Sequence, residues 1–134
     1  MPRTSATKHG EDVVASLDLH SFGDTRGVLV TSMNDVPGYH VVRVLTTVYG
    51  LTVRSRNIIA DIGAGFKSII GGELGVLTKM LYDSRNSAVD RMIGECLAKG
   101  GNAIIAFRFE GGEIEGRFAE VCAYGTACVV EKVD

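Results

Sequence analysis

The stretch Arg117–Glu131 reads RFAEVCAYGTACVVE and does most to decide the fold. Its polarity and size alternate with a period of two, which predicts one long β-strand. One face would carry Phe118, Glu120, Cys122, Tyr124, Thr126, Cys128 and Val130. The other face would carry Ala119, Val121, Ala123, Gly125, Ala127 and Val129. Because this second face is almost uniformly small, we expect a helix or another strand to pack close against it.

Three further strands are predicted before this one. Residues 102–110 alternate in the same way, and the glycine-rich loop 111–116 should join them to the last strand as a hairpin. Residues 28–32 and 41–54 are rich in β-branched side chains, and the Pro-Gly turn at 37–38 separates them. Gly50 interrupts the second run, which indicates a bulge or a close backbone contact.

Two helices are predicted between these pairs of strands. Apolar residues recur at three- and four-residue steps from 57 to 70, and again from 78 to 99. The glycine pairs Gly71-Gly72 and Gly100-Gly101 should end the two helices. The resulting order, ββααββ, predicts an α+β fold with a small antiparallel or mixed sheet and two helices.

Glycine is unusually frequent, at 17 of 134 residues. Gly50 and Gly125 lie inside predicted strands, where glycine weakens the element unless its backbone packs closely against a neighbour. We therefore expect a structural role for these two glycines and for the helix-ending pairs.

Length and charge limit the classes of function. A chain of 134 residues predicts one domain, which we place at residues 27–134, after a flexible N-terminal extension at 1–26. The formal net charge of −2 gives no reason to expect a nucleic-acid or membrane partner. Three cysteines, with no apolar leader at the N-terminus, favour a reducing cytoplasmic location.

The cysteines are the main candidates for chemistry. Cys122 and Cys128 share a strand face but are six residues apart, or roughly 20 Å, too far to hold one metal ion within a chain. A symmetric oligomer could gather copies of one cysteine around an axis, so both remain candidate metal ligands. The alternative for both, and the expectation for Cys96, is that the thiol packs as a small apolar group.

Other motifs point to no reaction. Residues 63–68 (GAGFKS) lack the glycines that a dinucleotide or phosphate loop requires. The glutamates near the hairpin, Glu110, Glu113, Glu115 and Glu120, lack the spacing of a calcium loop and favour a solvated hairpin. Because no nucleophile and base are recognisable together, we do not expect an enzyme.

Four segments, in order, resemble the YbjQ-like family. They are residues 57–62 (NIIADI), 69–72 (IIGG), 97–104 (LAKGGNAI) and 124–127 (YGTA). The resemblance implies a small α+β subunit similar to dodecin-type folds, assembled into a ring as a homopentamer. It also implies the family's label, "putative heavy-metal-binding", and no established activity. The chain departs from the family pattern at polar positions: Ala60, Glu73, Leu77, Thr78, Cys122 and Tyr124.

These observations predict an oligomeric binding module that takes a metal ion or small ligand at subunit interfaces. The alternative is a structural ring without small-molecule chemistry. The sequence does not identify the ligand.

Overall fold

The computed structural model describes residues 19–55 and 75–134. Its elements are β1 (Leu29–Val30), β2 (Tyr39–Ser55), α3 (Gly75–Ala98), β3 (Ala103–Ile114) and β4 (Phe118–Lys132). The four predicted strands and the second predicted helix are confirmed, with ends that differ from the prediction by a few residues. The first predicted helix and its terminal pair Gly71-Gly72 lie outside the described residues, so the two-helix prediction stays open.

The strands form one four-stranded mixed sheet in the order β1-β3-β4-β2. β1 runs parallel to β3, whereas β4 is antiparallel to both β3 and β2. β4, predicted from the alternating stretch, pairs along its whole length with β2, from Tyr39 opposite Lys132 to Ser55 opposite Phe118. It is therefore central, and its two faces belong to different environments.

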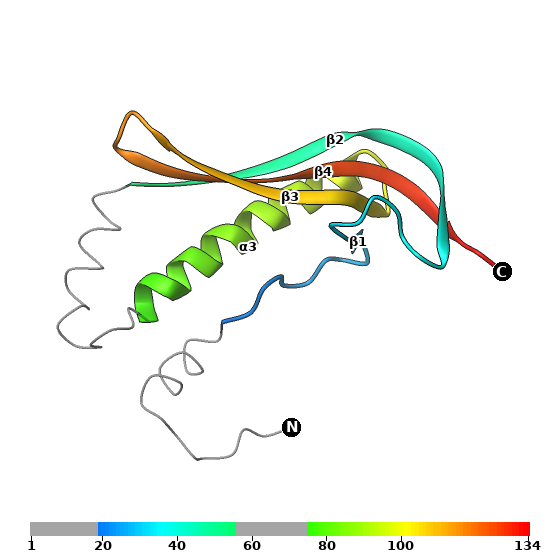
Figure 1. The fold of residues 1–134 in the computed structure, drawn as a ribbon, viewed down its shortest axis with the longest axis horizontal. Helices are drawn as coiled ribbons and strands as arrows, with labels where there is room; N and C mark the ends of the chain where they lie inside the picture. Colours follow the sequence, from blue (N-terminus) through cyan, green and yellow to red (C-terminus); the bar gives the residue numbers. More distant parts are fainter. Residues whose placement is uncertain (1–18, 56–74) are drawn as a thin grey trace, which may run out of the picture.

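Helix α3 lies across one face of this sheet, as Figure 1 shows. Met92 and Ile93 of the helix pack with Ala123 and Ala127 of β4 in one buried cluster. All four side chains are at most 1% exposed. The prediction that another element packs against the small-residue face of the last strand is confirmed.

Two glycines lie where the backbone of one element touches another. A methyl group added at Gly50 would lie 2.2 Å from the Ala88 carbonyl oxygen of α3. One added at Gly125 would lie 2.6 Å from Cγ2 of Ile104 on β3. The register of β2 is continuous through Gly50, and its shifts lie between Val41 and Thr46. Of the two alternatives for Gly50, close contact is therefore the one observed.

The other face of the sheet has no helix against it among the described residues. At its β1 end, Ala103, Cys128 and Val130 form a second buried cluster, covered by Val36 and Tyr39. Along β2, Tyr49, Leu51 and Val53 alternate with buried residues and are 60%, 39% and 46% exposed. This outward surface of β2 is therefore apolar and accessible in a single chain.

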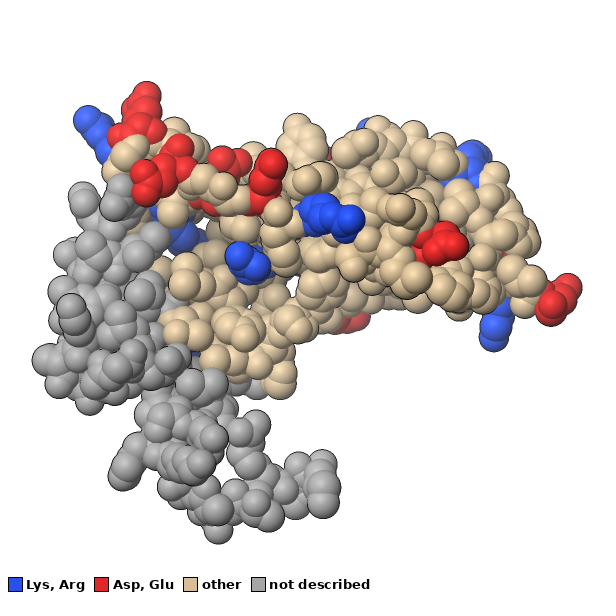
Figure 2. All heavy atoms as spheres, in the orientation of Figure 1, with Lys and Arg blue, Asp and Glu red and all other residues tan. Residues whose placement is uncertain are grey.

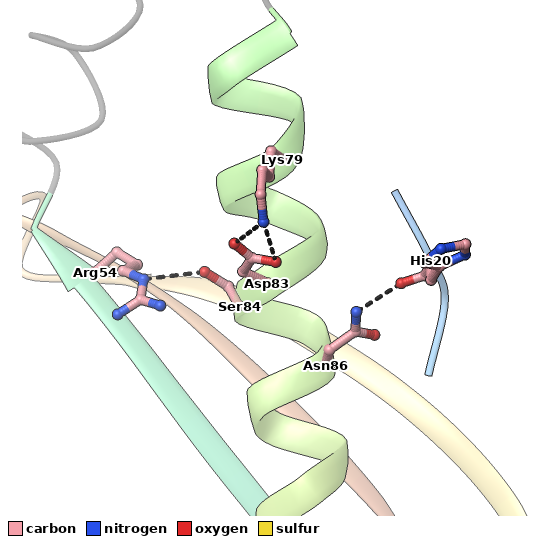
Figure 3. A network of polar contacts seen from close by, with 6 residues as sticks. All are labelled: His20, Arg54, Lys79, Asp83, Ser84 and Asn86. Carbon is pink, nitrogen blue, oxygen red and sulfur yellow. Dashed lines mark hydrogen bonds and ion pairs between the residues drawn. The ribbon is translucent and has the colours of Figure 1, made fainter. Parts of the chain in front are cut away.

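Residues 19–26 lie along α3. Asn86 donates from its side chain to the His20 carbonyl at 2.6 Å (Figure 3), and its Oδ1 accepts from the Phe22 backbone N–H at 2.9 Å. The Phe22 ring meets the Phe107 ring edge-on, with centroids 5.5 Å apart. Arg26 forms an ion pair with Asp90 at 3.0 Å. Residues 1–18 of the predicted extension lie outside the described part of the chain.

Over the same described ranges, no helix is both long enough and apolar enough to cross a membrane.

Candidate functional site

Two buried thiols meet at one carbonyl oxygen. Cys96 Sγ donates to the Ala103 oxygen at 3.6 Å, and Cys128 Sγ donates to the same oxygen at 3.7 Å. Both cysteines have no exposed surface. The two thiols share this acceptor but belong to different clusters, Cys96 to the one beneath α3 and Cys128 to the one on the other face of the sheet. The sequence predicts core packing for Cys96 and leaves Cys128 as a candidate ligand.

The end of α3 places Cys96 at this point. The Gly100 and Gly101 N–H groups donate back to the carbonyls of Leu97 and Cys96, at 3.0 and 2.9 Å. With Gly100 at a φ of 84°, this is a Schellman motif, which terminates a helix and reverses the chain. Gly101 must also stay small, since an added methyl would lie 2.7 Å from Cys96 Sγ.

Asn102 places Cys128. Its side-chain amide donates to the Val130 carbonyl at 3.0 Å and accepts from the Val130 N–H at 2.8 Å. Its backbone N–H donates to the Cys128 carbonyl at 3.0 Å. These three bonds join the start of β3 to β4 and set Ala103 directly opposite Cys128. The thiol pair is thus held by backbone geometry from three elements: α3, β3 and β4.

Both thiols are protonated at neutral pH, since both pKa values are raised. Burial is the main cause that raises the pKa of Cys96 above its ordinary value, and the neighbouring Cys128 adds to it. The hydrogen bond to Ala103 acts in the opposite direction on the Cys96 pKa. Burial likewise raises the pKa of Cys128. A thiol kept neutral in an apolar site is a poor nucleophile, so the pair is not arranged for covalent catalysis.

Cys122 occupies a separate place. It lies on β4 opposite Leu51 of β2 and Glu110 of β3, and its side chain is half-buried. Burial raises the pKa of this thiol, and the charges of Glu120 and Glu110 raise it further. Along one continuous strand, Cys122 stays roughly 20 Å from Cys128. A single chain therefore does not bring the two predicted ligands together, and their assignment as a shared metal site remains a prediction about an oligomer.

Comparison with known proteins places the chain in a family. Residues 28–131 match the family model described as "Putative heavy-metal-binding". The chain belongs to this family. A relative in Acidothermus cellulolyticus is 50% identical over 107 residues, which cover 80% of this chain and 99% of that protein. One in Streptomyces griseus is 53% identical, covering 79% of this chain and 88% of its own length. Both carry the name UPF0145 protein.

A solved structure supports the fold of the family member described here. A protein of unknown function from Pediococcus pentosaceus, of the DUF74 family, matches with a TM-score of 0.53. The match covers 78% of this chain and 99% of that one, at 16% sequence identity. At this identity the likeness concerns the fold alone.

The thiol pair suits a soft metal ion better than a hard one. Thiolate ligands select ions such as Cu(I), and two sulfur ligands satisfy a d10 ion that accepts linear coordination. A tetrahedral zinc site needs about four ligands. Within the described ranges, no group of three or more His, Cys, Asp or Glu side chains could hold a metal ion. Among the described residues, Cys96 and Cys128 therefore offer at most two sulfur ligands near the Ala103 carbonyl.

A signal for the Cys96–Cys128 pair was present in the sequence. A hairpin closed at the predicted loop 111–116 brings residues near 103 opposite residues near 128. Cys96 lies one turn before the helix-ending glycines, which return the chain to residue 103. Together these two inferences predict that Cys96 and Cys128 lie near the same residue, Ala103. The sequence analysis instead grouped Cys128 with Cys122, because both lie on the same face of one strand.

The acidic side chains at the hairpin remain exposed. Figure 2 shows acidic residues gathered at one end of the molecule, beside the β3–β4 turn. Glu110, Glu113 and Glu115 are exposed, and Glu120 is half-buried. The arrangement agrees with the prediction of a solvated hairpin.

Proposed function

We propose that the chain is a binding module for a soft, thiol-seeking metal ion, with Cys96 and Cys128 as its two ligands. The observation that carries this proposal is that each of the two sulfurs lies within 3.7 Å of the Ala103 carbonyl oxygen. The family description supports a metal as the ligand class. The reducing cytoplasm is the matching location, because thiols and Cu(I) both persist there.

Binding at this pair must release protons. Each thiol is neutral before binding and must become a thiolate, so one ion displaces two protons when both sulfurs coordinate. The burial that raises both pKa values opposes this loss, whereas the positive charge of the ion favours it. Affinity should therefore rise with pH between about 6 and 9.

Anaerobic titration with Ag(I), which is redox-inert and thiol-seeking, tests the proposal. Native mass spectrometry should show one ion per chain, and a pH indicator should register close to two protons released. Cys96→Ala and Cys128→Ala should each weaken binding by about 100-fold or more, because one thiolate remains. Alanine is chosen because it keeps the buried positions apolar.

Cys122→Ala is the matched control and should leave the stoichiometry and affinity unchanged. Ag(I) binding that is lost in Cys122→Ala but kept in the other two variants would overturn the proposal. It would favour the alternative that symmetry gathers Cys122 from several chains. Circular dichroism of each variant establishes that the fold is retained.

Self-assembly is the second part of the proposal: we infer a homopentameric ring. The number of subunits rests on the family resemblance, and the contact between them is supported by the outward surface of β2, where Tyr49, Leu51 and Val53 expose apolar side chains in a row. β2 is also an edge strand of the sheet, which is a common place for subunits to join. Light scattering should give about five times the chain mass, and Tyr49→Glu should reduce it, since a charge would be buried at the contact.

A ring without small-molecule chemistry is the alternative function. The same apolar surface favours it, because assembly needs no ligand. If the Ag(I) titration shows no binding while light scattering shows a multimer, the scaffold is the better description. A clean monomer at micromolar concentration would contradict both the ring and the scaffold.

A further inference from the structure

An apolar pocket lies where the segment before β1, the first half of α3 and β3 meet. Its volume is about 410 Å³, and Phe22, Leu81, Tyr82 and Phe109 supply its apolar and aromatic lining. Leu81 and Tyr82 are 51% and 39% exposed, so part of this lining is accessible from solution. A concave, mostly apolar surface with a few polar groups is typical of a small-molecule site.

The backbone of Phe22 is strained where it lines this pocket. Its φ of 68° lies in the left-handed region, which a bulky residue rarely adopts. Asn86 of α3 holds the segment in place: its Oδ1 accepts from the Phe22 N–H at 2.9 Å, and its Nδ2 donates to the His20 carbonyl at 2.6 Å (Figure 3). Strained backbone that its surroundings hold in place is concentrated at ligand-binding sites. The conformation of Phe22 therefore favours a functional role for this side of the pocket.

Three phenylalanine rings form a continuous aromatic wall. The Phe22 and Phe107 rings meet edge-on with centroids 5.5 Å apart, and the Phe107 and Phe109 rings do so at 4.8 Å. The pairing of β3 shifts register between Ile105 and Arg108, and Phe107 packs on the side of the sheet that α3 covers. Regular alternation from Ile105 would direct Phe107 to the opposite side, so the wall depends on this bulge.

Arg85 is the one charged residue among the described residues that line the pocket. Its guanidinium lies over the Phe109 ring, with Cζ 4.9 Å from the ring centre. It is exposed, and it forms no ion pair or side-chain hydrogen bond with another described residue. The side of the guanidinium away from Phe109 is therefore open to a second aromatic ring, whose π face attracts a cation.

The charges around the pocket favour a neutral ligand. Glu113 lies further along β3 than Phe109 and on the same helix-facing side of the sheet. Asp83 and Lys79 of α3 form an ion pair with each other at 2.9 Å. Because Arg85 and Glu113 carry opposite charges on the same side of the sheet, an anion and a cation would each meet repulsion as well as attraction.

We infer that this pocket binds a neutral, planar aromatic molecule, with one ring on the open side of the Arg85 guanidinium. A cavity of about 150 Å³ holds benzene, so a pocket of this larger volume has room for a bicyclic ring system of roughly nine to twelve non-hydrogen atoms. Arg85 supplies the selectivity for aromatic over saturated rings. Phe22, Leu81 and Tyr82 supply the apolar contacts.

Indole is the probe for this ligand class, and a matched pair of alcohols tests the role of aromaticity. Saturation-transfer NMR and calorimetry on the full chain should detect indole at millimolar concentration or below. Benzyl alcohol should bind about fivefold or more tightly than cyclohexylmethanol, which has the same number of non-hydrogen atoms but no π face. Indole-3-acetate and tryptamine should bind no more tightly than indole, because Glu113 repels the first and Arg85 repels the second.

Arg85→Met separates aromatic recognition from a structural role of this side chain. Methionine keeps an unbranched apolar stem without the guanidinium, so indole should bind about fivefold more weakly. The preference for benzyl alcohol over cyclohexylmethanol should disappear, while the binding of cyclohexylmethanol itself stays unchanged. Lys99→Met, which removes a cation just beyond the other end of α3, is the control and should alter neither value. Circular dichroism establishes that both variants are folded.

Tyr49→Glu separates the pocket from the exposed apolar surface of β2. Tyr49 lies on the outward face of that strand, so the variant should bind indole as the natural chain does. Loss of indole binding in this variant would place the ligand on the surface of β2 and overturn the inference.

Four other results would also overturn the inference. They are absence of indole binding, equal binding of the two alcohols, indole-3-acetate binding about tenfold more tightly than indole, and an unchanged preference for benzyl alcohol in Arg85→Met. None of these results depends on Ag(I) binding, so the pocket and the thiol pair can fail separately.

Discussion

At the scale of single residues, environment distinguishes the three cysteines. Cys96 and Cys128 are fully buried and share one acceptor, whereas Cys122 is half-buried near two glutamates. Cys122 and Cys128 thus occupy two different environments on one strand. Burial, not position in the sequence, decides which thiol an outside reagent can reach.

Alkylation should follow this order. Iodoacetamide at pH 8 should modify Cys122 first, and Cys96 and Cys128 only when the chain unfolds, because a buried thiol is neither accessible nor ionised. Peptide mass spectrometry after timed quenching measures the order. Modification of Cys128 at the rate of Cys122 would contradict the buried geometry. Guanidinium-unfolded protein, in which all three should react alike, is the control.

The buried thiols should also make the fold sensitive to alkali. Burial raises the pKa of Cys96 and Cys128 above the unfolded value near 9.0, so the unfolded chain loses these protons first as pH rises. The contribution of these two thiols to the free energy of unfolding is fully present below about pH 8. It is lost as the pH rises through the pKa values of the folded chain. Urea unfolding at pH 7.5 and pH 10 should show a smaller decline for the double variant Cys96→Ala/Cys128→Ala. An equal decline would exclude these thiols as the cause.

At the scale of elements, the contact between α3 and β2 depends on the absence of a side chain. A methyl group at Gly50 would lie within 2.8 Å of three atoms of α3, two of them backbone. Gly50→Ala should therefore force the helix away and destabilise the fold by about 3 kcal/mol. Thermal unfolding should show a fall in Tm of about 10 °C. Gly112→Ala, where an added methyl meets nothing within 4 Å, is the control.

The pairing of β3 with β4 should be equally sensitive at Gly125. An added side chain there meets Ile104 Cγ2 at 2.6 Å and the Ile105 carbonyl at 3.0 Å. Gly125→Val should lower stability by about 3 kcal/mol. Thr126→Val, at the next residue and on the opposite face of the strand, should change it by less than about 1 kcal/mol. A melting temperature for Gly125→Val equal to that of the natural chain would show that the strands can separate without cost.

At the scale of the whole molecule, the segment before β1 is part of the packing around α3. Phe22 contacts the main core cluster, and Arg26 is tied to Asp90. Phe22→Ala should cost about 2 kcal/mol, below the value for a fully buried aromatic because the ring is only half-buried. Trypsin should then cleave after Arg26 faster, and a rate equal to that of the natural chain would contradict the docking. Ser21→Ala, at an exposed neighbouring position, is the control.

The elements and their faces can be predicted from local signals along the chain. Alternation along residues 117–131, β-branched runs and helix-ending glycines are local signals, because strand and helix periods are imposed by backbone geometry within a few residues. They predicted β2, β3, β4 and α3, and the small-residue face that receives the helix. Gly50 was correctly singled out, although its two possible roles could not be separated.

Which reactive side chains come close together depends on contacts between segments that are far apart in the chain. Cys96 and Cys128 reach the same carbonyl because the chain reverses at Gly100 and because β3 pairs with β4 in one register. Both features depend on interactions along many residues, so no short stretch of sequence predicts them. Thr52 is likewise buried only through the fold, because it lies on the face of β2 that packs against α3. Local periodicity sets which way a side chain points, whereas its partners come from segments that are distant in the chain.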